Sequence, residues 1–359
     1  MYVMTTESGS MYASESAPAS ERINEWPPTV YYIKPSGFCA GIVRTEDAIR
    51  DATLMYPDRE RYLVGTPAHN QTVINRVQSG GWKMVNSIDL VPEGVLTVLG
   101  PHGSTEEDYK TARNKGLTLM DTVCPLVVDV QKGVKESLRE GNTVIVWGKP
   151  GHAETRAHIE VDPEEFDEES RRRLLLGTTP EQILSEGFLA QVENPNMVAF
   201  YAQTTHNADE AIEIRGKLKE RFPGLRSLKT DGICFATRDR QEAVKNMAQS
   251  AFEKDESLFW IVVGDETSSN SQELYRLATQ NGAAGFFVLK REQLFILYDE
   301  MLGYDAIAVT AGASAPQSDI DGVLDFCVEK GSVLREMQTG RDESNIRFKI
   351  PPIQAPGTY

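Results

Sequence analysis

Short apolar runs of four to six residues recur along the chain and alternate with longer amphipathic stretches. The apolar runs are rich in Val, Ile, Leu and Tyr and predict buried strands. These strands are expected at residues 30–33, 61–64, 95–99, 143–147, 197–201, 258–263 and 306–310. The amphipathic stretches predict helices at 126–140, 209–221, 239–253 and 272–280, and one with Pro316 in its first turn that runs to about residue 330. This alternation is typical of βα units and mostly parallel sheets.

Polar or thiol side chains follow nearly every predicted strand within a few residues. The carboxyl ends of parallel strands meet at one edge of a sheet, where α/β proteins bind ligands, so these side chains are candidates for a shared site. Their layout repeats three times, as a cysteine followed by two polar strand ends. The three sets are Cys39, His69 and His102; Cys124, His152 with Glu154, and Thr204; and Cys234, Ser268-Ser269-Asn270 and Ser314.

This repeat predicts three α/β modules of similar plan, at residues 29–122, 123–230 and 231–335. They are preceded by residues 1–28, which are rich in Ser, Glu, Ala and Pro and are expected to form a disordered tail. A C-terminal arm at 336–359 is expected to run over the surface. The segment 159–190 is an insertion, and its acidic-then-basic part at 162–173 is expected to be a solvated excursion.

The cysteines admit two interpretations. Cys39, Cys124 and Cys234 lie 85 and 110 residues apart, too far for a local zinc knuckle or a CxxC redox pair. They are either buried structural residues, as free cysteines often are, or three thiolate ligands from three modules. Three thiolates without a fourth could hold an iron–sulfur cluster that keeps one iron open for chemistry. The fourth cysteine, Cys327, lies within the apolar pattern of the last predicted helix and is expected in the core.

Composition narrows the class of partner. The formal net charge of −16 argues against nucleic acid as a main partner, because phosphate backbones require a basic face. A small anion remains possible, since it needs only a local pocket of donors. Four cysteines in 359 residues are no disulfide framework, which favours a reducing cytoplasm. The longest apolar runs fall well short of the roughly 18 residues that a membrane helix needs, so no membrane association is expected.

Several of these residues also have simpler explanations. Ser268 and its neighbours could cap a helix that precedes Gln272, and such a cap would also suit an anion site. Glu154 could be a solvated loop carboxylate. His158 and His206 lie outside the repeated layout and are expected at the surface or behind the site.

An ordered set of motifs resembles the IspH/LytB family of hydroxymethylbutenyl diphosphate reductases. The first motifs are Gly-Phe-Cys-Ala-Gly at 37–41, Ala-His-Asn at 68–70, His-Gly at 102–103, Asp-Thr-Val-Cys-Pro-Leu-Val at 121–127 and Gln-Thr-Thr at 203–205. The later motifs are Cys-Phe-Ala-Thr at 234–237, Arg-Gln-Glu-Ala at 240–243, Ser-Ser-Asn-Ser at 268–271 and Thr-Ala-Gly-Ala-Ser-Ala-Pro at 310–316. The resemblance runs from about residue 30 to 332.

The resemblance implies an α/β fold of three lobes in a pseudo-threefold arrangement around one central [4Fe–4S] cluster. The implied reaction removes the C4 hydroxyl of 4-hydroxy-3-methylbut-2-enyl diphosphate by reduction. Its products are isopentenyl and dimethylallyl diphosphate, in the last step of the methylerythritol phosphate route. By position, Cys39, Cys124 and Cys234 match the three iron ligands.

The resemblance also assigns roles around the substrate. Residues that match the diphosphate-binding set are His69, His102, Ser268, Ser269, Asn270 and Ser314. His152, Glu154 and Thr204 match the set at the reacting end, with Glu154 as the expected proton source.

The chain departs from the usual family pattern at several places, among them His152-Ala153-Glu154-Thr155 and Gly100-Pro101 before His102. A related reductase of another allylic alcohol diphosphate, and a non-catalytic iron–sulfur sensor or carrier, are the alternatives. The chain shows no flavin or nicotinamide fingerprint, so a ferredoxin or flavodoxin is the expected electron donor. The stretch Arg171–Arg173 is a candidate for docking it.

Overall fold

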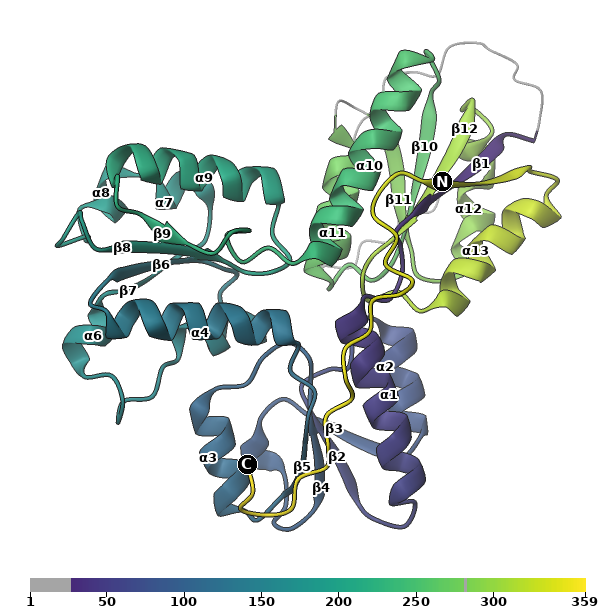
Figure 1. The fold of residues 1–359 in the computed structure, drawn as a ribbon. Coiled ribbons are helices and arrows are strands. Elements are labelled where there is room, and N and C mark those ends of the chain that lie inside the picture. Colours follow the sequence, from purple (N-terminus) through teal and green to yellow (C-terminus); the bar gives the residue numbers. More distant parts are fainter. Residues whose placement is uncertain (1–26, 281–282) are drawn as a thin grey trace, which may run out of the picture.

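The computed structural model describes residues 27–280 and 283–359, so most of the predicted N-terminal tail lies outside the described residues. Three parallel sheets form three lobes, which confirms the predicted α/β class and the three-lobed arrangement (Figure 1). The first sheet contains β2 (Arg61–Val64), β3 (Trp82–Val85), β4 (Leu96–Leu99) and β5 (Thr118–Asp121). The second contains β6 (Thr143–Trp147), β7 (Leu174–Gly177), β8 (Val198–Ala202) and β9 (Arg226–Ser227). The third contains β1 (Thr29–Lys34), β10 (Leu258–Val263), β11 (Ala284–Val288), β12 (Ala306–Ala311) and β13 (Leu334–Gln338).

Helices connect the strands and cover the sheets. In the first two lobes they are α1 (Ala40–Met55), α2 (Gln71–Ser79), α3 (Glu106–Asn114), α4 (Pro125–Arg139), α5 (Ala153–Ile159), α6 (Glu168–Arg172), α7 (Pro180–Ile183), α8 (Glu186–Leu189) and α9 (Ala208–Arg221). The third lobe has α10 (Phe235–Glu253), α11 (Ser269–Ala278), α12 (Leu294–Met301) and α13 (Gln317–Glu329). Short 3₁₀ turns lie at Ile88–Leu90 and Arg291–Gln293.

The three sheets share one strand order. They run β3-β2-β4-β5, β7-β6-β8-β9 and β11-β10-β12-β1-β13. In the first two sheets the second strand in sequence lies outside the first, and the third and fourth lie on the other side. The third sheet repeats this order with β10, β11 and β12 as its first three strands, with β1 in the fourth place and β13 beyond it. In this order, ligands bind beyond the carboxyl ends of the first and third strands, at the point where the winding reverses. The pseudo-threefold plan therefore places three such points in one molecule.

The first strand of the chain lies in the last sheet. β1 pairs in parallel with β12, where Thr29 lies opposite Ala306, and with β13, where Val30 lies opposite Leu334. The strand that opens the expected module 29–122 thus belongs to the sheet formed mainly by residues 258–338. In each sheet a cysteine follows the fourth strand: Cys124 follows β5, Cys234 follows β9 and Cys39 follows β1. Each cysteine then leads, through a helix, into the next sheet.

The apolar runs are continuous because helices cover both faces of each sheet. In β10, Phe259, Ile261 and Val263 enter one core cluster, and Trp260 and Val262 enter the cluster on the opposite face. All six residues of β10 are buried, as expected for a central parallel strand. The strands that the apolar pattern predicts are present, with ends that shift by at most one residue.

Several short strands are absent from the prediction. They are β3, β7, β9, β11 and β13, together with β5. β13 is an edge strand whose residues, Leu334 to Gln338, are mostly exposed, so it lacks the apolar signature of a buried strand. The predicted helix at 239–253 begins earlier, at Phe235, because Cys234 caps it.

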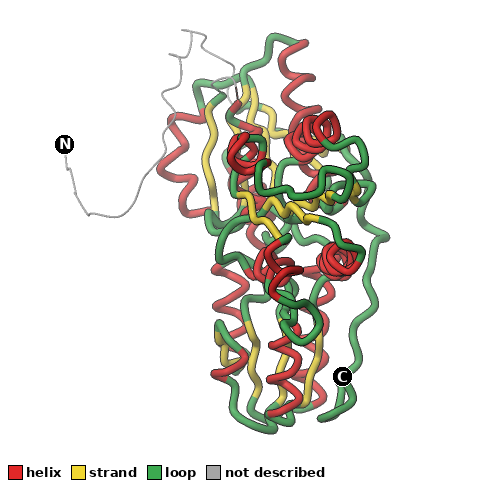
Figure 2. The backbone as a smooth tube through the Cα atoms, turned by 90° about the vertical axis from the view of Figure 1, so that its left-hand side faces the viewer, coloured by secondary structure: helices red, strands yellow, loops and turns green. Residues whose placement is uncertain are grey.

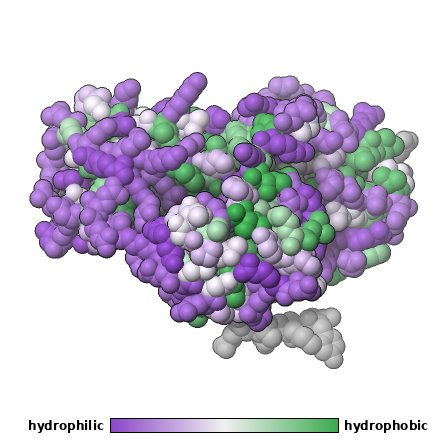
Figure 3. All heavy atoms as spheres, turned by 60° about the horizontal axis from the view of Figure 1, so that its bottom comes forward, coloured by the Kyte–Doolittle hydropathy of each residue, from purple (hydrophilic) through white to green (hydrophobic). Residues whose placement is uncertain are grey.

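The C-terminal segment after β13 extends along the outside of the molecule. It leaves the third lobe, passes the N-terminal end of α1 and ends beside the first lobe, where Leu119 and Gln354 form an antiparallel bridge (Figures 1 and 2). Hydrophilic residues predominate on the face seen in Figure 3, in keeping with the charged fraction of 25%. Among the described residues, no helix combines the length and the apolar character needed to span a bilayer.

Candidate functional site

The three lobes meet around one cavity, which residues of all three lobes line. All twelve predicted site residues line it: Cys39, His69, His102, Cys124, His152, Glu154, Thr204, Cys234, Ser268, Ser269, Asn270 and Ser314. They come from loops at the carboxyl ends of strands in all three sheets. The structure thus brings together side chains that the sequence spreads over 276 positions, from 39 to 314.

The three cysteines occupy equivalent places in the fold. Cys39, Cys124 and Cys234 are the N-caps of α1, α4 and α10. The backbone N–H of each donates to a carbonyl in the loop that follows the third strand of its sheet. The acceptors are Ala313 for Cys39 (3.2 Å), Pro101 for Cys124 (3.0 Å) and Thr204 for Cys234 (3.2 Å). Three helix N-termini with their partial positive charge therefore face one cavity, an arrangement that favours anionic sulfur.

The thiols are close to one another and are largely removed from water. A Cβ placed on Gly41 would lie 3.0 Å from Sγ of Cys124 and 3.7 Å from Sγ of Cys39, so this glycine leaves room for both sulfurs. Burial raises the pKa of Cys124 to about 12 and the pKa of Cys234 to about 11, and the nearby Cys39 thiol adds to both shifts. None of these cysteines forms a disulfide. Cys327 is 2% exposed within the core of the third lobe, as expected from its apolar surroundings.

The three cysteines are a donor set that could bind a metal group. Cys39, Cys124 and Cys234 come from three lobes and line one cavity, and thiolates are the usual ligands of iron–sulfur clusters. Among residues 27–280 and 283–359, no group of three His, Cys, Asp or Glu side chains has the arrangement of a single-ion site.

Three imidazoles form one wall of the cavity. The ring centres of His69 and His102 are 4.3 Å apart, and His152 lies 5.4 Å from His69 and 6.1 Å from His102. Burial lowers the pKa of all three, and for His152 it lowers the pKa to about 4. The rings are therefore neutral near pH 7. Nδ1 of His152 accepts the Glu154 backbone N–H at 3.2 Å, which assigns the ring proton to Nε2 as a donor.

Glu154 is a buried carboxyl group, and the structure excludes the solvated-loop alternative. Its side chain is 2% exposed. One oxygen accepts the Thr204 backbone N–H at 2.6 Å and the other accepts the Thr204 hydroxyl at 3.0 Å. Burial raises its pKa to about 7, although the two hydrogen bonds from Thr204 oppose that shift. His158 lies behind it, with Nε2 4.0 Å from a Glu154 oxygen. His158 is thus buried behind the site and is not at the surface. The ring of His206 stacks on the ring of Trp147, with the ring centres 4.2 Å apart.

The third lobe contributes hydroxyl and amide groups. Ser268 caps α11 by accepting the Ser271 N–H, so the helix-cap explanation of this motif is correct and leaves the N-terminus of α11 at the cavity. Hydroxyl oxygens of Ser269 and Ser314 are buried and have no hydrogen-bond partner among the described residues. Oδ1 of Asn270 accepts the Ala313 N–H at 2.9 Å, which orients its amide. Within the described part of the chain, no Lys or Arg lines this cavity.

Sequence reasoning gave no role to two residues that hold the site in place. The Thr237 backbone N–H donates to Sγ of Cys234 at 3.3 Å, and its hydroxyl oxygen lies 3.2 Å from the same sulfur. Gln203 accepts the Lys149 N–H and the Thr155 hydroxyl, both at 3.0 Å, and so fixes the loop before His152. A signal for Thr237 was its place three residues after a helix-capping residue.

Comparison with known proteins places the chain in a family. The model of the LytB protein family matches residues 30–327. The chain belongs to the LytB family. The family's curated members include a 4-hydroxy-3-methylbut-2-enyl diphosphate reductase of Azotobacter vinelandii, 34% identical over 319 residues, which cover 88% of this chain and 95% of that protein. The protein of the same name from Aeromonas hydrophila is 31% identical over 318 residues, 89% of this chain and 96% of that protein.

Solved structures of LytB-type reductases share the fold. The E-1-hydroxy-2-methyl-but-2-enyl-4-diphosphate reductase of Plasmodium falciparum matches with a TM-score of 0.76 at 22% identity, over 92% of this chain and 96% of that one. A second structure, of (E)-4-hydroxy-3-methyl-but-2-enyl diphosphate reductase, the terminal enzyme of the non-mevalonate pathway, matches with a TM-score of 0.57 at 25% identity. This match covers 84% of the present chain and 100% of the chain in the second structure.

Proposed function

We propose that this LytB-family protein reduces 4-hydroxy-3-methylbut-2-enyl diphosphate to isopentenyl and dimethylallyl diphosphate. The observation that carries the proposal is the meeting, in one cavity, of three cysteine thiols, a buried carboxyl group and a set of neutral anion donors. A sensor or electron carrier needs only the thiols. The buried Glu154, held by Thr204, and the partnerless hydroxyls of Ser269 and Ser314 are features of a site that also binds and protonates a substrate.

Cys39, Cys124 and Cys234 would hold a [4Fe–4S] cluster as three ligands. When bound, such a cluster supplies electrons and an open iron that can polarise a C–O bond. The protein favours it through the N-termini of α1, α4 and α10, which offset negative charge on the thiolates. Burial raises the pKa of the Cys124 thiol, so this thiol is protonated near pH 7 when no metal is bound and would release its proton on binding the cluster.

The overall reaction consumes two electrons and two protons. The C–O bond to the C4 hydroxyl breaks, the hydroxyl leaves as water after taking one proton, and the allylic carbon skeleton takes the second proton. Glu154 is placed to supply a proton, because burial raises its pKa to about 7 and a large share of it is protonated near neutral pH. Thr204 fixes both carboxyl oxygens, and His152 presents its Nε2–H at the same end.

The diphosphate would be held without lysine or arginine. His69 and His102 offer ring N–H groups, and their Nε2 atoms are buried without a partner among the described residues. Ser268, Ser269, Asn270 and Ser314 offer hydroxyl and amide donors beside the N-terminus of α11. Helix N-termini and neutral donors bind phosphate groups well when they are preorganised. This explains how a chain with a net charge of −16 can bind a strongly anionic substrate.

The electrons would come from an external carrier such as a ferredoxin or flavodoxin. The Arg171–Arg173 stretch is a poor docking place for it. Arg172 and Arg173 form ion pairs with Glu168 and Glu169, and α6 lies at the outer end of the second lobe, remote from the meeting point of the lobes (Figure 1).

The decisive experiment is an anaerobic assay of the reconstituted protein with 4-hydroxy-3-methylbut-2-enyl diphosphate and a chemical reductant. We expect both isopentenyl and dimethylallyl diphosphate as products. A protein that holds a full cluster but leaves this substrate unchanged would refute the proposal. Turnover of a different allylic alcohol diphosphate in the same assay would identify a related reductase.

A further inference from the structure

The C-terminal arm, expected from residue 336, begins at residue 339, because residues 336–338 belong to β13. The arm, residues 339–359, is attached to the rest of the chain at several points along its course. Near its start, Glu343 contacts the third lobe through Arg240. In its middle, the Lys349 carbonyl accepts a hydrogen bond from Arg44, and Ile350 and Ile353 pack on the cluster of apolar residues that includes Cys39. At its end, the Tyr359 hydroxyl donates to backbone carbonyls of the first lobe. The first two attachments are made through arginines that also bind the cysteine loops.

Arg240 links two of the cysteine loops to the arm. Its side chain is 1% exposed and pairs with both oxygens of Glu343, at 2.8 and 2.9 Å. The same guanidinium donates to the carbonyl of Gly37, two residues before Cys39, at 2.9 Å. It also donates to the carbonyl of Ala236, two residues after Cys234, at 2.9 Å. Glu343 is the carboxylate that pairs with this buried charge, and it comes from the arm.

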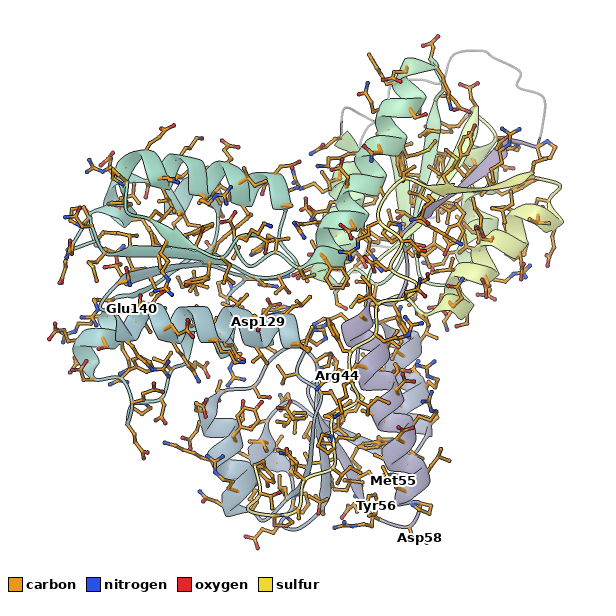
Figure 4. The ribbon with its side chains drawn as sticks, viewed as in Figure 1. Arg44, Met55, Tyr56, Asp58, Asp129 and Glu140 are labelled. Carbon is orange, nitrogen blue, oxygen red and sulfur yellow. The ribbon has the colours of Figure 1, made fainter. Side chains whose placement is uncertain are left out.

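Arg44 makes the corresponding link to the third loop. It lies on the first turns of α1, five residues after Cys39, beside the arm (Figure 4). It donates to the carbonyl of Val123, the residue before Cys124, at 2.9 Å, and to the carbonyl of Asp121 at 3.1 Å. Its Nε donates to the Lys349 carbonyl of the arm at 2.9 Å. Each nitrogen of this guanidinium therefore has a backbone acceptor.

We propose that the C-terminal arm, through Glu343–Arg240 and Lys349–Arg44, helps to hold the three cysteine loops in register with one another, in addition to the buried Thr45–Thr122 hydrogen bond between α1 and the Cys124 loop. The proposal rests on the proposed function in that the cysteines are taken as cluster ligands. Glu343, Arg240 and Arg44 are positioning residues, since none of them lines the cavity.

The physical reason is that the three ligands come from three separate lobes. Each cysteine is fixed within its own sheet by a hydrogen bond to a neighbouring loop, but nothing in that bond sets its distance from the other two sulfurs. Arg240 ties the Cys39 and Cys234 loops together, and Arg44 ties the α1 helix of Cys39 to the Cys124 loop. The arm orients both guanidinium groups. Mutation of groups that hydrogen-bond to metal ligands typically costs about 10- to 100-fold in metal affinity. Arg240 and Arg44 act one step further out, on backbone carbonyls next to the cysteines.

The test compares three variants of the full-length protein. Glu343→Gln removes the charge that pairs with Arg240, and Arg44→Lys keeps the charge but cannot reach three carbonyls at once. Tyr359→Phe is the matched control, because it removes the arm's two hydrogen bonds to Ala112 and Leu117 and touches no cysteine loop. Each protein is reconstituted anaerobically, and iron transfer to a ferrous chelator is followed far below the unfolding temperature, which is measured separately by circular dichroism.

We expect Glu343→Gln and Arg44→Lys to release iron about tenfold faster than the parent protein or more, and Tyr359→Phe to release it at the parent rate. In the metal-free proteins, alkylation of Cys39, Cys124 and Cys234 should be faster in the first two variants, with Cys327 unchanged. Parent-like iron release in Glu343→Gln and Arg44→Lys would overturn the inference. So would acceleration in all three variants in proportion to their loss of thermal stability. A parent protein that binds no iron would instead refute the proposed function, and the alkylation rates would still test the positioning role.

Discussion

Thr204 donates two hydrogen bonds to the carboxyl group of Glu154, one from its backbone N–H at 2.6 Å and one from its hydroxyl at 3.0 Å. The two residues are 50 positions apart and lie after different strands of the second sheet, β6 and β8. The pair fixes the orientation of a carboxyl group whose pKa burial raises to about 7. Such a group can store a proton at a defined place, which is what the proposed reaction requires.

Replacing Glu154 with Gln should abolish turnover and leave the cluster intact. The amide keeps the size of the side chain but cannot give up a proton, so we expect the rate to fall by about 10²-fold or more. The measurement is the anaerobic turnover rate beside the visible absorbance of the cluster and the iron content. Full activity in Glu154→Gln would show that the proton comes from elsewhere.

The cysteines should divide into three ligands and one core residue. Replacing Cys39, Cys124 or Cys234 with Ser should each lower the iron content after reconstitution, because a hydroxyl is a far weaker ligand for iron than a thiolate. Cys327→Ala is the control, since this thiol is buried in the third-lobe core. It should lower thermal stability and keep the parent iron content. Iron loss in Cys327→Ala would contradict the ligand assignment.

The hydroxyls of Ser269 and Ser314 should serve binding and contribute little to stability. Both are buried without a partner among the described residues, so the folded protein loses no internal hydrogen bond when they are removed. Hydrogen bonds to charged groups are worth about 1.5–3 kcal/mol, so Ser269→Ala or Ser314→Ala should weaken substrate binding about tenfold or more. Calorimetric titration with the substrate and thermal unfolding measure the two effects.

Ser332 provides the matched control for this prediction. Its hydroxyl is also buried and partnerless among the described residues, but it does not line the cavity. Ser332→Ala should therefore leave both substrate binding and stability near the parent values. Equal loss of binding in all three alanine variants would mean that the cavity hydroxyls have no special role.

Acid should destabilise the fold through its buried histidines. Burial lowers the pKa of His152 and His206 to about 4 and that of His158 to about 3, whereas an unfolded chain titrates its histidines near 6.5. Below pH 6.5 the histidines of the unfolded chain therefore bind protons, whereas the same histidines of the folded chain stay neutral. Each such histidine lowers the free energy of unfolding by about 1.4 kcal/mol per pH unit. The contribution of the neutral histidines to the free energy of unfolding is fully present above pH 6.5 and is lost as the pH falls toward 4 and then 3.

Urea unfolding of the metal-free protein between pH 7 and pH 4.5 measures this slope. Glu154 acts in the opposite direction, because its raised pKa lets the folded chain bind a proton first. His158→Leu should reduce the slope by about one proton, since it replaces a buried base whose pKa burial lowers to about 3 with an apolar group that does not titrate. An unchanged slope in this variant would show that His158 is already protonated in the fold.

The alternation of apolar and amphipathic segments determined the class of the fold. Runs such as Leu258–Val263 are apolar on both faces, and only a central parallel strand covered on both sides buries such a run completely. The polar residues after these strands could be found for the same reason, because strand ends are where an α/β sheet exposes its loops. The positions of the twelve candidate site residues could therefore be predicted from the sequence.

Which strands share a sheet was decided by the tertiary structure. β1 completes the third sheet, where it pairs with β12 and β13 from the far end of the chain. Val30 and Tyr32 enter the core cluster on one face of this sheet, and Tyr31 and Ile33 enter the cluster on the other face. No local pattern encodes that choice. Each cysteine follows a strand of one sheet and precedes the helix that leads into the next sheet, and all three cysteines line one cavity.

The state of the site residues also came from the tertiary structure alone. The sequence specifies that residue 154 is a glutamate, but burial by three lobes and the hydrogen bonds from Thr204 set its pKa. Likewise Glu343 reads as one acidic residue in a polar arm, and only the fold places it against the buried Arg240. The pKa of a group depends on its burial and on the charges around it, and both come from residues that are distant in the sequence. The residues next to it in the sequence therefore do not determine its pKa.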